Sequence, residues 1–472
     1  MTGISLIIVF AILIAILIFM MSKLNIHAFL AMMIVSLALG LIAGIPLVNT
    51  TVDGKTIVGM NNIIVQGFAN TIRSIGIVII FGAMIGMILE LTGAAFKLAD
   101  MVIKVVGTKR PVLGIELMGW IVSLPVFCDS GFVILDPVRK ALVKKTRVSS
   151  VSTSIALSLG LYASHVFIPP TPGPIAAATT LYKDGLGVDP NLLLVMGMGA
   201  LASIPCLIGA YFFATWIGKR VKSKEDLDLD SITKTYEEIV ASYGKLPGGI
   251  SAIMPIFVPI LLIGLGSIAT MNKWTGNIRM FTDFFGTPFV AIGMGVVCGV
   301  VQVFQVGKQS RFYDMCNDCM KVVGPIIFIT GCSGILGLTI QSTSIVSYIR
   351  ENAVTLTTVG IFLPFIISAI LKTAQGSSTV ALITTSAIVA PMLGVLGLES
   401  SVGVALCVMS IAAGSMTVSH ANDSYYWVVT NFGGMTQQQG YKVQTLGTFV
   451  QGMCGIIGVF ILKIIFINIL GL

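Results

Sequence analysis

The sequence predicts an all-α polytopic membrane protein built as an inverted-topology repeat, and three observations support this fold class. The 472-residue chain is 56% hydrophobic and only 10% charged, whereas a soluble globular protein contains about 25% charged residues. The apolar residues gather in segments of about 20, the length of a membrane-crossing helix. The same order of apolar segments and polar interruptions also occurs twice along the chain.

Composition excludes several other classes of protein. The net charge is +8, but no basic groove or nucleic-acid motif accompanies it, so the basic residues are interpreted as determinants of membrane orientation. The apolar stretch from Met1 to Met21 lacks a basic start and a cleavage site, which favours a retained first helix over a signal peptide. Cys316 and Cys319 form a lone CxxC that nothing nearby completes, so we expect no metal and no cofactor.

Eight segments have the length and composition of uninterrupted membrane spans. They are 4–21, 26–45, 72–92, 191–217, 250–270, 286–306, 322–340 and 443–470. Two longer apolar segments, 148–184 and 402–432, contain the helix-breaking residues Pro169 and Asn422. We expect each of these two to be a helix that is broken within the membrane.

Two further apolar stretches, 112–143 and 355–396, have the length of helical hairpins with a Gly/Ser-containing turn near the middle. Basic residues flank 112–143 on both sides, which places both of its ends in the cytoplasm. The sequence therefore predicts a re-entrant hairpin with its tip at 128–131, since each arm is short for a full span. The second hairpin enters from the opposite face, with its tip at 376–378.

The count of spans divides the chain into three parts. We expect a first inverted repeat at 1–217, a cytoplasmic linker at 218–248 and a second inverted repeat at 249–472. Each repeat has five transmembrane helices, one of them broken, and one hairpin, and the N-terminus lies outside. The linker carries a cluster of acidic residues typical of a solvated connection: Glu225, Asp226, Asp228 and Asp230.

Four polar interruptions inside the apolar segments predict a transporter's binding site. Broken helices are tolerated at membrane depth only where protein or a water-filled cavity covers them, and matching breaks in two halves mark binding sites in transporters. Free N–H groups and helix ends there attract ions. The hydroxyl and amide side chains at the interruptions, which suit a small polyhydroxylated anion, are Ser130, Thr171, Ser377, Ser378, Thr379, Asn422 and Ser424. For Ser377 to Thr379 the alternative is close helix packing by small residues.

Ionisable residues within membrane segments are candidates for function. Lys372, close to the second hairpin tip, either holds a substrate carboxylate, pairs with an acid or extends to the membrane surface. Asp129 or Asp423 carries a coupling proton, because burial shifts a carboxylate towards neutral pH. His165 and His420 either titrate or bond backbone freed by the breaks.

Three acidic residues outside this set receive weaker interpretations. Glu90 is either functional or the cytoplasmic end of the third helix. Glu116 and Asp136 lie on the arms of the first hairpin, and we expect them to orient it through Arg139.

Several motifs resemble the gluconate permease family of bacterial proton symporters, within the ion transporter superfamily, over nearly the whole chain. They are LPVFCDSG (124–131), HVFIPPTPGP (165–174), AQGSSTVA (374–381), AIVAPML (387–393) and NDSYYWVV (422–429). The resemblance implies import of gluconate, idonate, D-serine or another small hydroxy acid by proton symport across the bacterial inner membrane. It also implies two hairpins per protomer, a homodimer and an elevator movement. Many members carry Glu, then Val-Gly, where this chain has Asp129, Ser130 and Gly131.

We therefore predict a secondary active transporter that imports a small hydroxycarboxylate, such as gluconate or a related sugar acid, with H⁺. Na⁺-coupled carboxylate transport and a D-serine or other hydroxy-acid permease are the alternatives. An enzyme is disfavoured because no HExxH or GxSxG motif occurs, and a channel is a further class. The expected partners are a small anionic or zwitterionic hydroxy acid, the lipid bilayer and a second copy of the chain, without nucleic acid.

Overall fold

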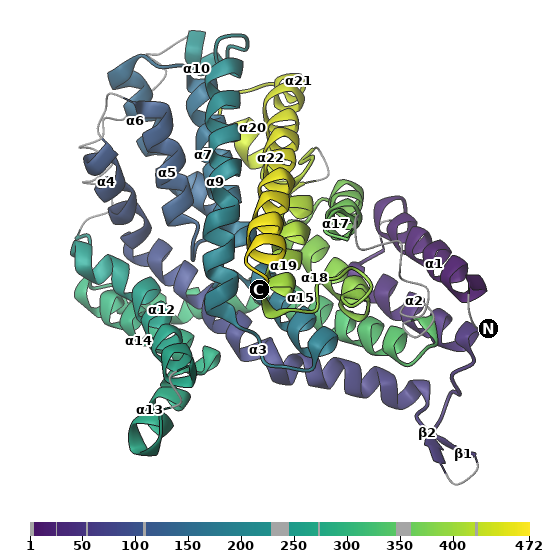
Figure 1. The fold of residues 1–472 in the computed structure, drawn as a ribbon. Helices are drawn as coiled ribbons and strands as arrows, with labels where there is room; N and C mark the ends of the chain where they lie inside the picture. The colour runs from purple at the N-terminus through teal and green to yellow at the C-terminus, as the bar shows by residue number, and fades with distance from the viewer. Residues whose placement is uncertain are drawn as a thin grey trace.

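The computed structural model describes residues 4–24, 26–52, 55–106, 110–227, 245–271, 274–345, 360–420 and 423–472 (Figure 1). Nearly all of these residues are helical. Within the described ranges, 6 helices are long and apolar enough to cross a membrane, or 7 if the bent helix α3 is taken as one span. The polytopic helical class is thus confirmed, while the two-stranded sheet is a small addition that the sequence did not predict.

The first helices agree with the predicted spans, but the third is longer. Helix α1 (Ile4–Ser22) and helix α2 (Ala28–Ala43) are followed by an antiparallel hairpin of β1 (Thr50–Val52) and β2 (Lys55–Ile57). Helix α3 (Met60–Thr92) begins well before residue 72 and bends by 43° between its two parts. The amphipathic helix α4 (Ala94–Val106) was not predicted, because it is shorter than a membrane span.

The first hairpin region contains two helices, but its turn lies earlier than predicted. Helix α5 (Pro111–Val122) and helix α6 (Cys128–Thr146) are joined by residues 123–127, so Cys128 begins a helix and does not form the tip. The Ser123 hydroxyl donates a hydrogen bond to the Val126 carbonyl at 2.8 Å, which closes the turn. Pro125 lacks the N–H that would continue α5.

The second hairpin turns where the sequence predicted. Helix α17 (Phe362–Gln375) ends at Gly376, whose φ of +86° is a left-handed conformation that favours glycine. Helix α18 (Ser378–Val389) begins directly afterwards, and the Ser377 side chain accepts a hydrogen bond from the N–H of Val380. The start of the predicted hairpin, before residue 360, lies outside the described residues.

Both predicted broken helices are broken. Helix α7 (Ser150–Phe167) stops before an irregular segment at 168–171, and helix α8 (Pro172–Thr180) follows. Helix α19 (Ser401–Met416) stops in the same way before helix α20 (Ser424–Phe432). Pro172 suits the first position of α8 because its missing N–H has no helical partner there.

The remaining helices are α9 (Leu192–Ile217), α10 (Lys224–Leu227), α12 (Gly249–Met271), α13 (Gly276–Gly286), α14 (Pro288–Gln305), α15 (Phe312–Gln341), α21 (Gln437–Gly440) and α22 (Leu446–Lys463). The short 3₁₀ or π segments are η1 (Leu181–Leu186), η3 (Gln309–Arg311), η5 (Ala390–Met392), η6 (Tyr441–Thr445) and η7 (Ile464–Ile469). Helix α13, which was not predicted, projects from the body at the lower left of Figure 1.

Two long helices, α3 and α15, cross the molecule packed against each other (Figure 1). Their close approach depends on Gly67 and Gly334: a Cβ on Gly67 would lie 2.7 Å from the backbone of Ile335. Helix α2 packs on α15, and α14 packs on α3, so each half of the chain contributes to this part of the structure in a corresponding way.

The hairpins and broken helices pack around a large cluster of buried apolar residues, which also includes residues of α3, α12 and α14. Helix α5 packs on α7, α17 packs on α19, and α9 lies beside α22. The two halves are also interleaved, because α8 packs on the hairpin helix α18 and α20 packs on the hairpin helix α6. This exchange brings interruptions that are far apart in the sequence to one place.

Candidate functional site

A buried ion pair joins the second hairpin to the second broken helix. Lys372, in the last turn of α17, is 1% exposed, and its Nζ donates to Asp423 Oδ2 at 2.6 Å. The same ammonium donates to the carbonyl of Gly376. Asp423 is the N-cap of α20, where its Oδ1 accepts from the N–H of Tyr425 at 3.0 Å, and its Oδ2 also accepts from Ser419 Oγ at 2.5 Å. Of the three expectations for Lys372, pairing with an acid is the one that the structure shows.

Two buried tyrosines form a wall beside this ion pair. The ammonium of Lys372 lies 5.7 Å from the ring centroid of Tyr162, within reach of a cation–π interaction. The rings of Tyr162 and Tyr425 meet edge to face at 5.2 Å, and Tyr162 hydrogen-bonds with Ser378. Sequence reasoning missed Tyr162, since a tyrosine inside an apolar helix gives no signal of its own, whereas Tyr425 lay within a quoted motif.

Asp129 faces the same place from the first hairpin. It lies in the first turn of α6, and Ser424 Oγ donates to its Oδ2 at 3.4 Å. Among the described residues its Oδ1 has no hydrogen-bond partner although it is buried. Asp129 also interacts electrostatically with Asp423 and Lys372. Two carboxylates, one from each half of the chain, therefore interact electrostatically with one lysine.

Glu90 belongs to this neighbourhood. Its side chain is half-buried and hydrogen-bonds with Ser130, next to Asp129 on the first turn of α6. Glu90 lies in the last turn of α3 (Met60–Thr92), and its contact with Ser130 brings this helix end beside the first hairpin.

The two histidines occupy corresponding positions near the breaks but have different surroundings. His420 Nε2 lies 2.9 Å from the carbonyl of Thr373, so this ring bonds the backbone of the second hairpin. His165 is buried, and the centroid of its ring lies 5.7 Å from that of Phe127. Its Nδ1 has no hydrogen-bond partner among the described residues. The hydroxyl of Thr171 donates to the His165 carbonyl at 2.7 Å, which ties the first break together.

The remaining predicted hydroxyls lie at the start of α18 and around it. Ser377 caps that helix, and Thr379 lies against the start of α8, where a Cβ on Gly173 would be 3.7 Å from its Cα. Asn422 lies outside the described residues. The structure thus brings together six charged or hydroxyl side chains: Lys372, Asp423, Asp129, Ser424, Ser419 and Ser378. The hydroxyl of Thr171 instead hydrogen-bonds to the backbone.

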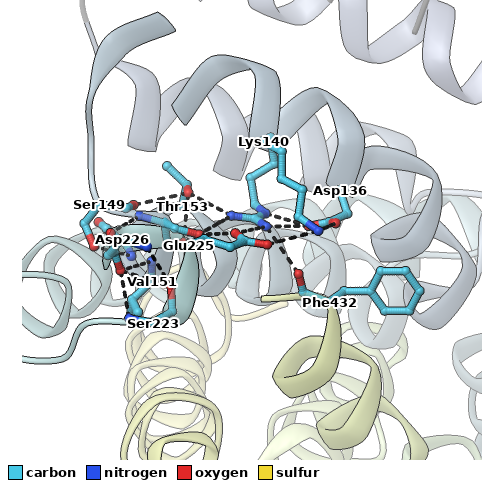
Figure 2. A network of polar contacts seen from close by, with 12 residues as sticks. Asp136, Lys140, Ser149, Val151, Thr153, Ser223, Glu225, Asp226 and Phe432 are labelled. Atoms are coloured by element: carbon cyan, nitrogen blue, oxygen red, sulfur yellow. Dashed lines mark hydrogen bonds and ion pairs between the residues drawn. The ribbon is translucent and has the colours of Figure 1, made fainter. Parts of the chain in front are cut away.

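A second polar network lies at the far end of the same helices (Figure 2). Arg139, which is 0% exposed, pairs with Asp136 at 2.6 Å, as expected, and also with Glu225 at 2.9 Å. Lys140 pairs with the same two carboxylates. Glu116 does not take part: both of its carboxylate oxygens are buried and have no partner in the described ranges, so its predicted contact with Arg139 is wrong.

The start of the linker is docked into this network and is not a purely solvated connection. Glu225 is 8% exposed, and Asp226 accepts from the N–H of Ser150 at 2.6 Å, which caps α7 (Figure 2). Burial alone raises the pKa of Glu225, but the charge of Arg139 and the hydrogen bonds from Ser150 and Arg139 outweigh it and hold the pKa below its ordinary value. The predicted linker residues Asp228 and Asp230 lie outside the described residues.

A cavity of about 710 Å³ separates α8 from the group formed by α12, α13 and α14. Ile175 and Thr179 of α8 line it, and so do Arg73 at the bend of α3 and Lys183 in η1. In the described part of the chain, no group of three or more His, Cys, Asp or Glu side chains is arranged to hold a metal ion.

Charged and hydroxyl side chains that meet at broken helices inside a polytopic helical body define a membrane transporter. The family described as GntP family permease matches residues 4–465, so the chain belongs to that family. It is a multi-pass inner-membrane protein, as its relatives include the inner membrane permease YgbN of Escherichia coli, at 28% identity over 92% of this chain and 93% of that protein.

Other relatives and solved structures extend the comparison. An uncharacterized permease of Haemophilus influenzae is 31% identical, covering 96% of this chain and 91% of that protein. The gluconate permease of Zymomonas mobilis is 28% identical, covering 94% of each. The Alcanivorax borkumensis YdaH transporter has a similar fold, with a TM-score of 0.65 at 13% identity, covering 94% of this chain and 98% of that one.

Proposed function

We propose that this protein is a secondary active transporter that imports a small hydroxycarboxylate, gluconate or a related sugar acid, by proton symport. The observation that carries this proposal is the completely buried Lys372 between a hairpin tip and a broken helix, paired with Asp423, which also accepts from the Ser419 hydroxyl. A buried cation beside free helix ends suits a substrate carboxylate, and the neighbouring serines suit its hydroxyls. Relatives named as gluconate permeases support the substrate class.

In this proposal the first contacts of the substrate come from both hairpins. Lys372 faces the carboxylate, and the hydroxyl and amide groups that bind the rest of the substrate are Ser130, Thr171, Ser377, Ser378, Thr379, Asn422 and Ser424. Either Asp129 or Asp423 exchanges the coupling proton, because both carboxylates interact with Lys372. His165 and His420 remain secondary candidates for this role.

The arrangement of the chain supports an elevator movement. The two halves repeat the same order of elements, with interleaved half-helices, which is consistent with an inverted repeat, re-entrant hairpins and a linker on the cytoplasmic side. The part that carries the hairpins moves against the part built on α3 and α15. The cavity beside α8 lies between these two parts, where such a movement requires room. By its family resemblance the transporter is a homodimer.

Uptake by proteoliposomes tests this function. Purified protein is reconstituted, and labelled gluconate uptake is measured with an inward pH gradient and no Na⁺. We expect accumulation that a protonophore abolishes. Lys372→Met removes the partner of the carboxylate, a loss of about 2–5 kcal/mol, or at least roughly 30-fold in affinity.

Lys321→Met is the matched control, since Lys321 forms an exposed ion pair with Asp318 at the start of α15. It should transport like the wild type. Equal uptake by the two lysine variants would contradict the carboxylate role of Lys372. Uptake that requires Na⁺ and persists with the protonophore would replace proton symport by sodium coupling.

A further inference from the structure

The ammonium of Lys372 already donates to two acceptors in this structure. Of its three N–H donors, one is directed to Asp423 Oδ2 and another to the Gly376 carbonyl, and the ring of Tyr162 lies on a further side. A substrate carboxylate that joined Asp423 on this ammonium would leave two buried anions on one cation, so it must displace the carboxylate already there. Asp423 is the acceptor of the same chemical type, so it occupies the place of the substrate's carboxylate.

We propose that the substrate carboxylate displaces Asp423 from Lys372 and that Asp423 then takes up the symported proton. This inference rests on the proposed function and assigns its coupling step to one atom. A proton from the external water binds Oδ2 of Asp423, Lys372 keeps its own proton, and its ion pair passes to the substrate. The buried site gains one anion and one proton, so its net charge does not change.

Asp423 cannot remain ionised after it is displaced. Its carboxylate is 5% exposed, and it would keep only the hydroxyl of Ser419 and the N–H of Tyr425 as partners. A buried carboxylate that loses its cation is strongly destabilising, and here a second anion would lie beside it. Proton uptake removes both costs.

The groups around Asp423 leave Lys372 as its counter-charge. From α17 the facing group is Lys372, from α6 they are Asp129 and the Cys128 thiol, and from α7 and α20 they are the phenols of Tyr162 and Tyr425. His420, three residues before Asp423, is directed to the backbone of α17. In the described part of the site, loss of Lys372 therefore leaves Asp423 among groups that are neutral or negative.

Coupling requires that the proton affinity of the carrier group depend on whether substrate is bound. By linkage, the affinity for substrate then depends in the same measure on whether that group is protonated. Asp423 meets this requirement because substrate and proton act on the same ion pair. Among the described residues, Asp129 has no hydrogen bond to Lys372, and its carboxylate accepts one from Ser424 Oγ at 3.4 Å. Protonation of Asp129 therefore depends less on whether Lys372 is occupied.

Calorimetry of gluconate binding in buffers with different ionisation enthalpies tests the proposal, because it counts the protons taken up with the ligand. For purified wild-type protein at mildly alkaline pH we expect about one proton per gluconate and a Kd that rises about tenfold per pH unit, the slope of one linked proton. Asp423→Asn, which cannot take up the proton, should bind gluconate with no proton uptake and with a pH-independent Kd.

Two aspartate variants serve as comparisons. Asp129→Asn should still take up the proton, and so should Asp318→Asn, which alters an exposed carboxylate on α15. If Asp423→Asn is unstable in detergent, membrane vesicles provide the second measurement: this variant should exchange labelled gluconate across the membrane but fail to accumulate it under a pH gradient.

The outcomes separate this inference from the proposed function. If Asp423→Asn takes up as many protons as the wild type, the exchange is overturned while proton symport stays intact. The same conclusion follows if proton uptake is lost in Asp129→Asn but not in Asp423→Asn. Wild-type protein that binds gluconate without a proton overturns both the exchange and proton symport. Wild-type protein that binds no gluconate overturns the proposed substrate and the exchange with it.

Discussion

Replacing Arg139 with methionine removes the centre of the second polar network while keeping most of the side-chain volume. The guanidinium is completely buried and forms ion pairs with Asp136 and Glu225, together with a 2.7 Å hydrogen bond to Ser150 Oγ. It also reaches the carbonyl of Phe432 at the end of α20 (Figure 2). The substitution thus leaves two buried carboxylates without their main counter-charge and removes the contacts of this side chain with Ser150 and Phe432.

The expected loss of stability follows from burial. Removing one partner of a buried ion pair typically costs about 3–5 kcal/mol. Lys140 remains 2.8 Å from Asp136 and 3.0 Å from Glu225 and compensates in part. We therefore expect Arg139→Met to lower the free energy of unfolding by about 3 kcal/mol, the lower end of that range.

Lys140→Met provides an internal control because it removes a cation from the same two carboxylates. The side chain of Lys140 is 29% exposed, and exposed ion pairs contribute only about 0–1 kcal/mol. The comparison between these two variants isolates the contribution of burial and of the guanidinium's several hydrogen bonds.

Reversible unfolding in mixed micelles, followed by tryptophan fluorescence at increasing SDS, measures both variants against the wild type. The reasoning is refuted if Arg139→Met loses less than about 1 kcal/mol or no more than Lys140→Met. Such a result would mean that the network is hydrated in the membrane-embedded protein, with the carboxylates compensated by water.

Three further predictions address packing and acid sensitivity. Gly82→Ala should destabilise the protein by about 1–3 kcal/mol, since the added Cβ would lie 2.5 Å from the Pro170 carbonyl oxygen. Gly324→Ala, which has open space around it, should instead stabilise the protein by about 0.5–1 kcal/mol. Equal effects of the two substitutions in thermal unfolding would contradict the close approach at Gly82. Because the pKa of Glu225 is lowered in the folded state, its contribution to stability is complete above the ordinary pKa of 4.5 and is lost as pH falls through the folded-state pKa. The variant Glu225→Gln should therefore lose less stability below pH 4.5 than the wild type, when the unfolding free energy is measured against pH. Glu116→Gln should change the unfolding free energy by less than about 1 kcal/mol, because an unpartnered buried carboxyl is expected to be neutral; a loss of several kcal/mol in the same assay would show that it is ionised.

The positions of the turns illustrate how far local sequence information extends. The turn at Gly376 was located correctly, because a glycine with positive φ followed by a capping serine is a local signal. The first turn was placed too late, at 128–131, since Cys128 to Gly131 carry turn-forming residues but in fact begin α6. There the position of Pro125 and the contact of the Pro125 carbonyl with Gly86 of α3 decide the geometry.

The hydropathy and break pattern by itself determined that this protein is a polytopic helical membrane protein with two hairpins and two broken helices, because lipid restricts which segments can be helical and where they can be interrupted. It also singled out Lys372, Asp129 and Asp423 as ionisable groups in apolar surroundings. Only the tertiary structure decided which of them meet, and that Glu225 of the linker is buried against Arg139. These contacts join residues from different parts of the chain, through the packing of α20 on α6 and of α8 on α18, and no local pattern specifies such partners.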